Sequence, residues 1–575
     1  MHKKFDNQAI EAKWQKKWTD SGLYDTPKRD TEKDKEYVLV ELPYPSGNLH
    51  IGHWYAFAVP DIYVRFKRML GTQVIFPMGF DAFGLPAENA AIKHDKDPKA
   101  WTEGNIAYMK EQLGNMGNAF SWDMTTSTTD QDYYRWTQYM FTQFFEKGLA
   151  YRGEAVVNWD PVDNTVIANE QVLADGTSER SGAVVEKKTM PQWMLRITDY
   201  ADRLVDDLDK LNWPEHIKEA QRQWIGRSQG SAIDFTLSTD DTVTVFTTRA
   251  DTLYGATFLV LAPEHPLVEK HKETIANWSE VETYIQEASQ KDEQDRLNDT
   301  KEKTGVRLEG ITATNPANGE VIPVYIADYV LASYGTGAVM AVPAHDERDH
   351  AFATKYNVPI KAVLSPDRST FGLGDTPEAA NSDLQNKTDN LLAGGKPYTN
   401  TGTLINSDEF DDMSSEEAKV AITEKVGGSM TNTYRLRDWS VGRQRYWGVP
   451  IPIVYDPAGN AHPVPKEHLP WVLPTDVDFK PTGEAPLAKS AELKKRTEEI
   501  FGAGWTPEVE TMDTFLDSSW YFLRYIDNQN DDLMVSKEAQ EAWMPIDLYF
   551  GGAEHTTMHV LYSRFWQKAL YTLGT

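Results

Sequence analysis

The sequence predicts an α/β protein in which a parallel-sheet domain is interrupted by an inserted α+β domain. Strand-like and helix-like segments alternate through the N-terminal part, as they do in parallel sheets with crossover helices. The composition shifts after residue 226, and helical and aromatic patterning resumes at Tyr434. We therefore expect the first half of the parallel-sheet domain at residues 1–226, the insert at 227–431 and the second half at 432–575.

The first half begins with a helical segment and then a strand, a loop and a helix. Residues 7–21 carry apolar side chains at helical spacing, and Gly22 follows as a C-cap. The β-rich segment 37–42 is ended by the loop 43–47, which contains Pro and Gly, and a helical pattern covers residues 53–70. Because ligands bind at the carboxyl ends of parallel strands, this loop is a candidate site. The later elements expected here are a strand over 72–76 and helices over 101–116 and 133–147.

The insert is expected to begin with a strand pair. Residues 232–237 and 242–247 have β-rich patterns and are joined by a short polar turn. Residues 365–407 are rich in Gly, Asn, Asp, Thr and Pro, which is typical of a loop or linker. The stretch 369–398 has no role that the sequence predicts.

The composition is that of a folded acidic protein and excludes several kinds of site. The chain has 58 Lys and Arg against 87 Asp and Glu, but its 40% hydrophobic and 11% aromatic content separates it from disordered acidic chains. It has no cysteine, which excludes disulfides, thiolate zinc sites, iron–sulfur clusters and a cysteine nucleophile. No secretory signal and no apolar run of about 20 residues is visible, so we expect a cytoplasmic protein without a membrane span.

A histidine pair follows the first expected strand, in the sequence His50-Ile51-Gly52-His53. The N-terminus of the expected helix presents free N–H groups and a positive dipole end, and histidines three positions apart direct donors to one place. Such preorganised donors suit a phosphate and would stabilise the charge that develops on an α-phosphate under attack. Two unrelated structural histidines are the alternative.

This segment resembles the HIGH signature of class I aminoacyl-tRNA synthetases, and further segments resemble the bacterial-type leucyl-tRNA synthetases among them. These segments are residues 77–89, 437–448 and 512–521. The resemblance extends over nearly the entire chain. It implies a Rossmann-like catalytic domain that is interrupted by an editing domain.

The resemblance implies roles for residues of the catalytic domain. Asp81 would hold the α-ammonium group of leucine in a charge-assisted bond, and a cap or turn aspartate is the alternative. The other residues implied to shape the leucine pocket, with core packing as the alternative, are Tyr44, Phe515, Ser518, Tyr521 and His555. Those implied in catalysis or ATP binding are His50, Gly52, His53, Gly551, Gly552 and Glu554.

A second histidine pair, His555 and His559, has a spacing that a metal site could use if both lie on one helical face. The zinc-protease pattern needs Glu directly after the first histidine, whereas Glu554 precedes it here. A metal-dependent hydrolase is therefore the weaker alternative. We expect ATP with its Mg²⁺ as the cofactor, and no protein-bound metal.

The insert resembles the editing domain of the same family in residues 247–252 and 335–349. A leucine pocket separates amino acids that differ by one methylene by only about 1–3 kcal/mol, so a second, hydrolytic site improves accuracy. An aminoacyl ester is already activated, so a water held by threonine hydroxyls and backbone groups can hydrolyse it. The resemblance implies that Asp349 binds the ammonium group of the substrate and that Thr252 obstructs the leucine side chain. The implied editing residues are Thr247, Thr248, Arg249, Thr252, Asp346 and Asp349. An edge strand and a solvated charged turn are the alternatives.

The chain departs from the family pattern at two places. Many bacterial relatives carry a cysteine-bound zinc module, whereas residues 160–163 and 177–182 here contain no cysteine, so we expect the module over 151–192 to be a loop without zinc. The signature loop Lys-Met-Ser-Lys-Ser, an anticodon-binding bundle and a tRNA-binding tail do not occur before Thr575. We therefore expect weak leucine activation by this chain.

The favoured hypothesis is a leucine–tRNA ligase. It would form leucyl-adenylate from leucine and ATP, transfer leucine to tRNA(Leu) and hydrolyse mischarged tRNA. A freestanding aminoacyl-tRNA deacylase that uses only the insert is the alternative. We expect a monomer.

Overall fold

The computed structural model describes most of the chain and divides it into two compact units. The described residues are 6–173, 175–289, 291, 296, 302–331, 335–366, 390, 393, 395–480 and 484–574. Unit 1 comprises Met1–Trp224 and Leu436–Thr575, and unit 2 comprises Ile225–Arg435. Most of the stretch 369–398 lies outside the described residues. The α/β class and the insertion of one domain into another are as predicted.

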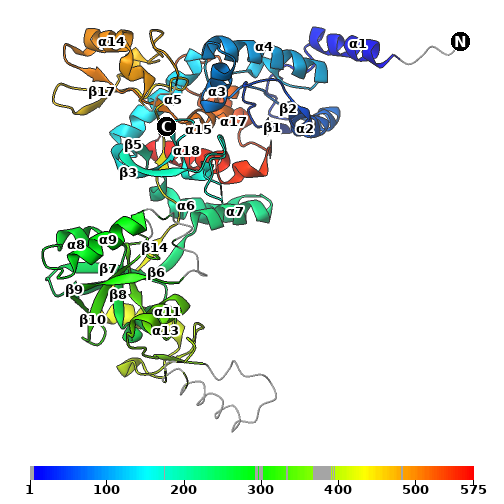
Figure 1. The fold of residues 1–575 in the computed structure, drawn as a ribbon. Coiled ribbons are helices and arrows are strands. Elements are labelled where there is room, and N and C mark those ends of the chain that lie inside the picture. The colour runs from blue at the N-terminus through cyan, green and yellow to red at the C-terminus, as the bar shows by residue number, and fades with distance from the viewer. Residues whose placement is uncertain are drawn as a thin grey trace, which may run out of the picture. The chain divides into compact units, whose positions relative to one another are not determined.

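Unit 1 contains a parallel sheet in the order β2-β1-β21. Figure 1 shows β1 and β2 beside α2. Strand β1 (Lys35–Val40) pairs in parallel with β2 (Gln73–Ile75) on one side and with β21 (Leu548–Phe550) on the other. Helix α2 (Ile51–Met69) connects β1 to β2. Residues separated by about 500 positions along the chain thus meet at one edge, the carboxyl ends of β1 and β21.

Helix α2 packs on this sheet along one narrow face. Phe57 and Val64 of the helix are buried against Val38, Val40 and Val74 of the strands. The rest of the helix surface is unusually apolar and faces outward. The large hydrophobic residues exposed along α2 and its end are Ile51, Trp54, Tyr55, Val59, Ile62, Phe66, Met69 and Leu70.

Residues 151–192 form a sheet and not the loop that was expected. Strands β3 (Ala150–Asp160), β4 (Thr165–Ile167) and β5 (Glu186–Leu195) are antiparallel, and β15 (Trp439–Ser440) completes the order β15-β5-β3-β4. The reason is the long β-rich register of β3 with β5, from Ala150 opposite Leu195 to Trp159 opposite Glu186. Only the connections between the strands are irregular.

Further helices and short strands complete unit 1. The helices are α1 (Asn7–Asp20), α3 (Leu85–Lys93), α4 (Pro98–Met116), α5 (Gln131–Glu146), α6 (Ala201–Asp206), α7 (Glu215–Ile225, whose last residue belongs to unit 2), α14 (Ala491–Phe501), α15 (Thr514–Ser518), α16 (Tyr521–Tyr525), α17 (Lys537–Trp543) and α18 (His559–Leu573). The strands are β16 (Gly442–Arg443) with β20 (Thr511–Met512), and β17 (Ile453–Tyr455) between β18 (Ala461–Pro463) and β19 (Thr506–Pro507).

Unit 2 is built on a mixed sheet in the order β11-β8-β10-β9-β6-β14, with β7 paired to β6. Its central strand β8 (Phe258–Leu261) is buried on both faces: Leu259 and Leu261 belong to one hydrophobic cluster, and Phe258 and Val260 belong to another. The other strands are β6 (Ser228–Leu237), β7 (Thr242–Thr247), β9 (Gly305–Thr314), β10 (Val321–Ala327), β11 (Ala338–Ala341), β14 (Ser429–Thr433) and the separate pair β12 (Leu364–Ser365) and β13 (Thr403–Leu404). The helices are α8 (Pro266–Lys270), α9 (Trp278–Ser289), α11 (Glu347–Tyr356) and α13 (Ser415–Lys425).

None of the helices in the described part of the chain is both long enough and apolar enough to cross a membrane.

Candidate functional site

The two histidines at the start of α2 are fixed by each other and by the helix backbone. His50 is the N-cap, and its Nδ1 accepts the Gly52 N–H at 3.1 Å, while His53 Nδ1 accepts the His50 N–H at 3.3 Å. Because both Nδ1 atoms accept hydrogen bonds, the protons of the neutral rings lie on Nε2. The rings lie 4.0 Å apart, His50 is exposed and His53 is half-buried. Two Nε2–H donors therefore remain available to a ligand at this helix N-terminus.

Gly52 is required by the same arrangement. A Cβ at this position would lie 2.9 Å from Cε1 and 3.0 Å from Nδ1 of His50. Burial and the neighbouring His50 lower the pKa of His53, which keeps its ring neutral. The order His-Ile-Gly-His thus gives a capped helix start with both rings on the same side.

The predicted ATP residues Gly551 and Gly552 follow β21 and lie beside Glu41, which follows β1. The Gly552 N–H donates to Glu41 Oε1 at 2.6 Å, and a Cβ at Gly551 would collide with the same carboxylate. Burial raises the pKa of Glu41 to about 7, and nearby Glu554 adds to the rise, while the Gly552 N–H opposes it. Glu41 was not predicted as a site residue. Its signal in the sequence is an acidic residue directly after a buried apolar strand.

Asp81 is buried beside the loop that follows β1. Its N–H donates to the Pro43 carbonyl at 3.1 Å, and Thr514 Oγ1 donates to its Oδ1 at 3.1 Å. Burial raises the pKa of Asp81 to about 7, and Thr514, Arg180 and Ser518 oppose the rise. A buried carboxylate of this kind, without a cation in direct contact, is suited to an ammonium group.

The other predicted leucine-pocket residues gather around Asp81 and β1. Ser518 lies against Asp81, the ring of Phe515 lies 6.4 Å from that of His555, and the Tyr521 hydroxyl donates to the Val40 carbonyl at 3.3 Å. Phe515, Ser518 and Tyr521 are buried, while Tyr44 and His555 are half-buried. His555 Nε2 lies 3.8 Å from Glu41 Oε1. The structure thus brings this set together, although parts of it also serve as core.

Two further charged groups of this region have no counterpart among the predicted residues. The guanidinium of Arg180 lies over the ring of Tyr44, 5.1 Å from its centroid. Asp517 is fully buried, and its carboxylate accepts a hydrogen bond from the Thr137 hydroxyl at 3.0 Å. Burial and the nearby Asp81 raise the pKa of Asp517 well above its usual range. Asp517 lies within the family-like segment 512–521, between the predicted residues Phe515 and Ser518, so its neighbours indicated the site although it was not chosen. No periodic pattern around Arg180 indicates its position, which tertiary folding determines.

The expectation that His555 and His559 share one helical face is wrong. Residues Ala553–Thr556 form a 3₁₀ turn, and Met558 has a non-helical conformation with φ −109° and ψ −103°. Helix α18 therefore begins only at His559. His559 is buried with its pKa lowered to about 3 by burial and by His555. Among the described residues there is no group of three or more His, Cys, Asp or Glu side chains that could hold a metal ion.

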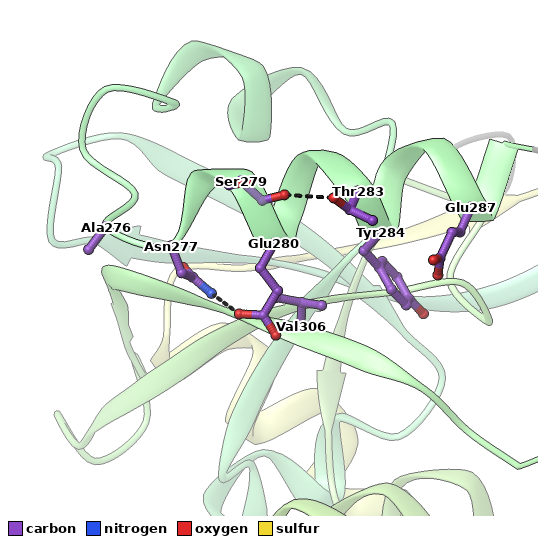
Figure 2. A pocket seen from close by; sticks show the side chains of 8 residues that line it. All are labelled: Ala276, Asn277, Ser279, Glu280, Thr283, Tyr284, Glu287 and Val306. Atoms are coloured by element: carbon purple, nitrogen blue, oxygen red, sulfur yellow. Dashed lines mark hydrogen bonds between the residues drawn. The ribbon is translucent and has the colours of Figure 1, made fainter.

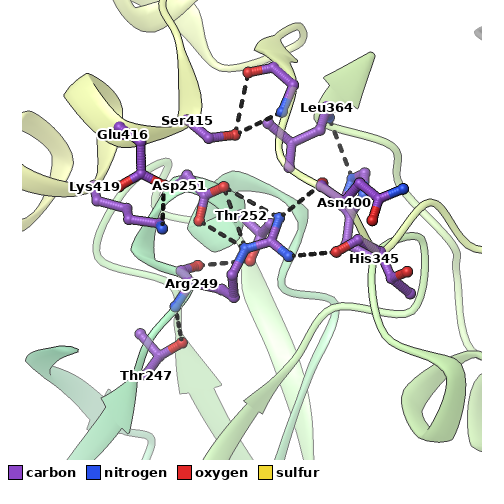
Figure 3. Close-up of polar contacts among 12 residues, drawn as sticks. Thr247, Arg249, Asp251, Thr252, His345, Leu364, Asn400, Ser415, Glu416 and Lys419 are labelled. Carbon is purple, nitrogen blue, oxygen red and sulfur yellow. Dashed lines mark hydrogen bonds and ion pairs between the residues drawn. The ribbon is translucent and has the colours of Figure 1, made fainter. Parts of the chain in front are cut away.

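In unit 2, Arg249 forms an ion pair with buried Asp251, and Figure 3 shows this pair beside Thr247 and Thr252. Arg249 Nε contacts Asp251 Oδ1 at 3.1 Å, and the Asp251 side chain is wholly buried. The same guanidinium donates to the Thr399 carbonyl at 2.9 Å and to the Asn400 carbonyl at 3.4 Å. Arg249 therefore fastens the segment after β7 to the loop around residue 400.

The predicted threonines differ in exposure. Thr247 Oγ1 accepts the Arg249 N–H at 3.0 Å, and Thr248 is exposed. Thr252 is completely buried, and its hydroxyl donates to the Arg249 carbonyl at 2.7 Å. Thr252 thus lies beneath the surface, so a contact with a substrate side chain would require the layer above it to open.

Asp346 and Asp349 stand at the start of α11. Asp346 is the N-cap and accepts the N–H groups of Arg348 and Asp349 at 2.9 and 3.0 Å. Asp349 is buried and accepts the Val342 N–H at 2.8 Å, and burial together with Asp346 raises its pKa to about 8. The alternative of a solvated charged turn does not describe Asp349, which is 6% exposed.

His345 in the same run is a structural residue. Its Nδ1 contacts the Tyr398 carbonyl at 3.0 Å, and its Nε2 accepts the N–H groups of Val363 and Leu364 at 2.9 and 3.2 Å. Burial lowers its pKa to about 4. Both ring nitrogens are therefore occupied, and the ring is held neutral.

Two surface cavities lie in unit 2. One, of about 520 Å³, lies at the start of α11. It is lined by charged side chains, including the N-cap Asp346 and Arg348, and by Thr399. The other, of about 670 Å³, lies between α9 and β9 and is shown in Figure 2. In this second cavity Asn277 Nδ2 donates to Glu280 at 3.0 Å and the Thr283 hydroxyl to the Ser279 carbonyl at 2.8 Å. Asn277 is also bonded to the backbone of Arg307 and Glu309, so its side chain is held in place by the protein itself.

Comparison with known proteins gives a consistent result over both units. Residues 222–427 match the family description "Leucyl-tRNA synthetase, editing domain", and residues 13–302 match "tRNA synthetases class I (I, L, M and V)". The leucine–tRNA ligase of Rubrobacter xylanophilus is 48% identical over 99% of this chain and 67% of that protein. The leucine–tRNA ligase of Herpetosiphon aurantiacus is 47% identical over 100% of this chain and 69% of that protein.

A solved structure has a similar fold. The agnB2 LeuRS of Agrobacterium radiobacter K84, in a ternary complex with tRNA and LeuAMS, superposes with a TM-score of 0.82 at 36% identity, over 99% of this chain and 66% of that chain. The chain thus spans about two thirds of the length of the relatives that it matches.

Proposed function

The chain belongs to the leucyl-tRNA synthetase family of class I aminoacyl-tRNA synthetases, and on this basis we propose that it activates leucine with ATP and transfers it to tRNA(Leu). The observation that carries the proposal is the histidine pair at the start of α2, whose Nε2–H donors follow the loop after β1. Buried Asp81 is bonded to the same loop, through the Pro43 carbonyl. A phosphate donor and an amine would thus be held at one edge of the sheet.

In the first step a carboxylate oxygen of leucine attacks the α-phosphorus of ATP. The bond between that phosphorus and the bridging oxygen breaks, and pyrophosphate leaves with its Mg²⁺. His50 and His53 would stabilise the charge that accumulates on the phosphate oxygens, and the N–H groups at the start of α2 would add to this. Gly52 permits the ring geometry, and Gly551, Gly552 and Glu554 would line the nucleotide after β21.

Leucine would be held by the group around Asp81. The Asp81 carboxylate would bind the α-ammonium group, which would in turn restore the carboxylate to its charged form. Tyr44, Phe515, Tyr521 and His555 would surround the branched side chain, and Ser518 would contact Asp81. In the second step a ribose hydroxyl at the 3′ end of tRNA attacks the leucyl carbonyl, and AMP leaves.

We further propose that unit 2 hydrolyses mischarged tRNA. Water would attack the ester carbonyl, and the tRNA hydroxyl would leave. Asp349 would bind the ammonium group of the aminoacyl ester, Asp346 would fix the start of α11, and Arg249 would hold the loop around residue 400 against the site. Thr247, Thr248 and Thr252 would shape the pocket. A freestanding deacylase remains the second candidate, because unit 2 has a hydrophobic core of its own.

Two substitutions separate these functions when they are made in a chain extended to the length of its relatives. In that longer chain His53→Ala should lower leucine-dependent exchange between ATP and pyrophosphate by about 100-fold or more, the usual cost of a lost transition-state donor, and leave deacylation of mischarged tRNA unchanged. Asp349→Ala should lower deacylation of mischarged tRNA and leave the leucine-dependent exchange unchanged. A chain with deacylation but no exchange and no binding of a non-hydrolysable leucyl-adenylate analogue would be a deacylase. If each substitution lowered both activities equally, the two-site proposal would be wrong.

A further inference from the structure

The turn that carries Arg180 reaches from the sheet of residues 150–195 into the predicted leucine pocket. The guanidinium lies over the ring of Tyr44, 5.1 Å from its centroid. Its charge also acts on Asp81 and His555, because it lowers the pKa of both. Three residues that are proposed to hold leucine therefore lie within the electrostatic reach of one cation.

Arg180 is also incompletely hydrogen-bonded. Its Nε is buried and has no hydrogen-bond partner among the residues that the structure describes. It lines a narrow cavity of about 20 Å³ together with two other arginines. Those two are committed elsewhere: Arg443 pairs with Asp513 at 2.7 Å, and Arg445 pairs with Glu88 at 2.7 Å. A buried donor without an acceptor is costly, so an acceptor supplied by a ligand would be favourable.

We propose that Arg180 binds the carboxylate of leucine, and the carbonyl oxygen that replaces it in leucyl-adenylate. This rests on the proposed function, in which Asp81 takes the ammonium group. Arg180 and Thr514 line the same narrow cavity, and the Thr514 hydroxyl donates to Asp81 at 3.1 Å. The two charged groups of an amino acid are attached to the same carbon, so the cation on this side of Asp81 is where the carboxylate would lie. The fork of a guanidinium can direct two N–H donors toward a carboxylate, and when it holds a single oxygen the other oxygen is free to attack phosphorus.

A hydrogen bond between the turn 177–182, which carries Arg180, and the turn 160–163 holds the two turns together. Asp160 accepts the N–H groups of Val162 and Asp163 at 3.0 Å each and the hydroxyl of Ser181 at 2.6 Å. Burial alone would raise the pKa of Asp160, but these hydrogen bonds lower it below its usual value. The carboxylate is therefore charged, which strengthens its hydrogen bond with the Ser181 hydroxyl. Asp160 is therefore a positioning residue for the turn 177–182.

The test compares leucine with leucinol, which has the ammonium group and side chain but no carboxylate. Dissociation constants are measured by titration calorimetry on the full chain. Arg180→Ala should weaken leucine binding by about 10- to 100-fold, the range of a charge-assisted hydrogen bond, and change leucinol binding by less than about twofold. Equal losses for both ligands would mean that Arg180 only supports the pocket and would overturn the proposal.

Two further variants guard against a folding defect. Arg180→Lys keeps the charge but not the fork, so its leucine affinity should lie between those of the wild type and Arg180→Ala at an unchanged melting temperature. Asp160→Ala should reproduce the selective loss for leucine, and the double variant should be no weaker than Arg180→Ala alone. Additive losses in the double variant would contradict the positioning role of Asp160.

The outcomes also separate this proposal from the proposed function. If the wild type bound neither leucine nor leucinol, the assignment of the leucine pocket would fail. If the wild type bound leucine more tightly than leucinol and Arg180→Ala kept that difference, the pocket would stand and the role of Arg180 would be refuted.

Discussion

Replacing Asp81 by Asn should stabilise the ligand-free protein while it weakens leucine binding. The carboxyl is buried, and its pKa rises from 3.8 to about 7 because burial penalises the charged form. Between pH 3.8 and about 7 the Asp81 carboxyl is protonated in the folded chain and ionised in the unfolded chain. The free energy of unfolding therefore decreases as the pH rises through this range. Above the folded pKa the full cost of this shift is about 4 kcal/mol.

Asn keeps an oxygen that can accept the Thr514 hydroxyl but carries no charge. At pH 8, Asp81→Asn should therefore raise the unfolding free energy by up to about 4 kcal/mol, and at pH 4 by less than about 1 kcal/mol. Scanning calorimetry over this pH range measures the difference, with the exposed Asp532→Asn as the matched control. Leucine affinity should fall by about 10- to 150-fold, because a charge-assisted bond contributes about 1.5–3 kcal/mol. A melting temperature that is lower than that of the wild type at pH 8, or a shift that does not depend on pH, would refute the reasoning.

Three further predictions follow from the geometry. Gly52→Ala should weaken binding of a leucyl-adenylate analogue by about 10-fold or more, since its Cβ would displace the His50 ring; unchanged affinity would contradict the role of the cap. Gly104→Ala, in α4 with open space around it, should instead stabilise the chain by about 1 kcal/mol in thermal unfolding, as is usual for a helix-interior glycine. The kcat/KM of deacylation should increase with pH up to about 8, where Asp349 becomes ionised, and Asp349→Asn should remove this dependence; an identical pH profile in the variant would exclude the Asp349 carboxylate as its source.

Much of the fold could be predicted because its signals are local. The strand over 242–247 has the predicted bounds, and the helix predicted over 53–70 lies within two residues of α2. Alternating or helical apolar patterns and Gly or Pro at the ends determine such elements. The sheet of residues 150–195 is not evident in the sequence because β3 alternates exposed and half-buried residues over 151–156 and β5 begins with four exposed residues, which leaves little apolar pattern to recognise.

The site was predictable only where a motif carries it. His50 and His53 stand three positions apart in one segment, so their proximity follows from helix geometry. Arg180 and Tyr44 are separated by more than a hundred positions, and nothing local to either residue indicates their contact. The burial of Thr252 could not be foreseen either, because it depends on the layer that Arg249 and the loop around residue 400 place over it.

The outward-facing apolar side chains of α2 have a practical consequence for work in solution. An exposed hydrophobic surface of this kind binds detergents, fluorescent dyes and other copies of the chain. A dye that reports exposed hydrophobic surface should therefore fluoresce on the native protein, which makes heat capacity or tryptophan emission the sounder reporter of unfolding. The light that this chain scatters per unit mass should also increase with its concentration, because copies associate. Replacing Ile62 and Phe66 with Lys should suppress that increase.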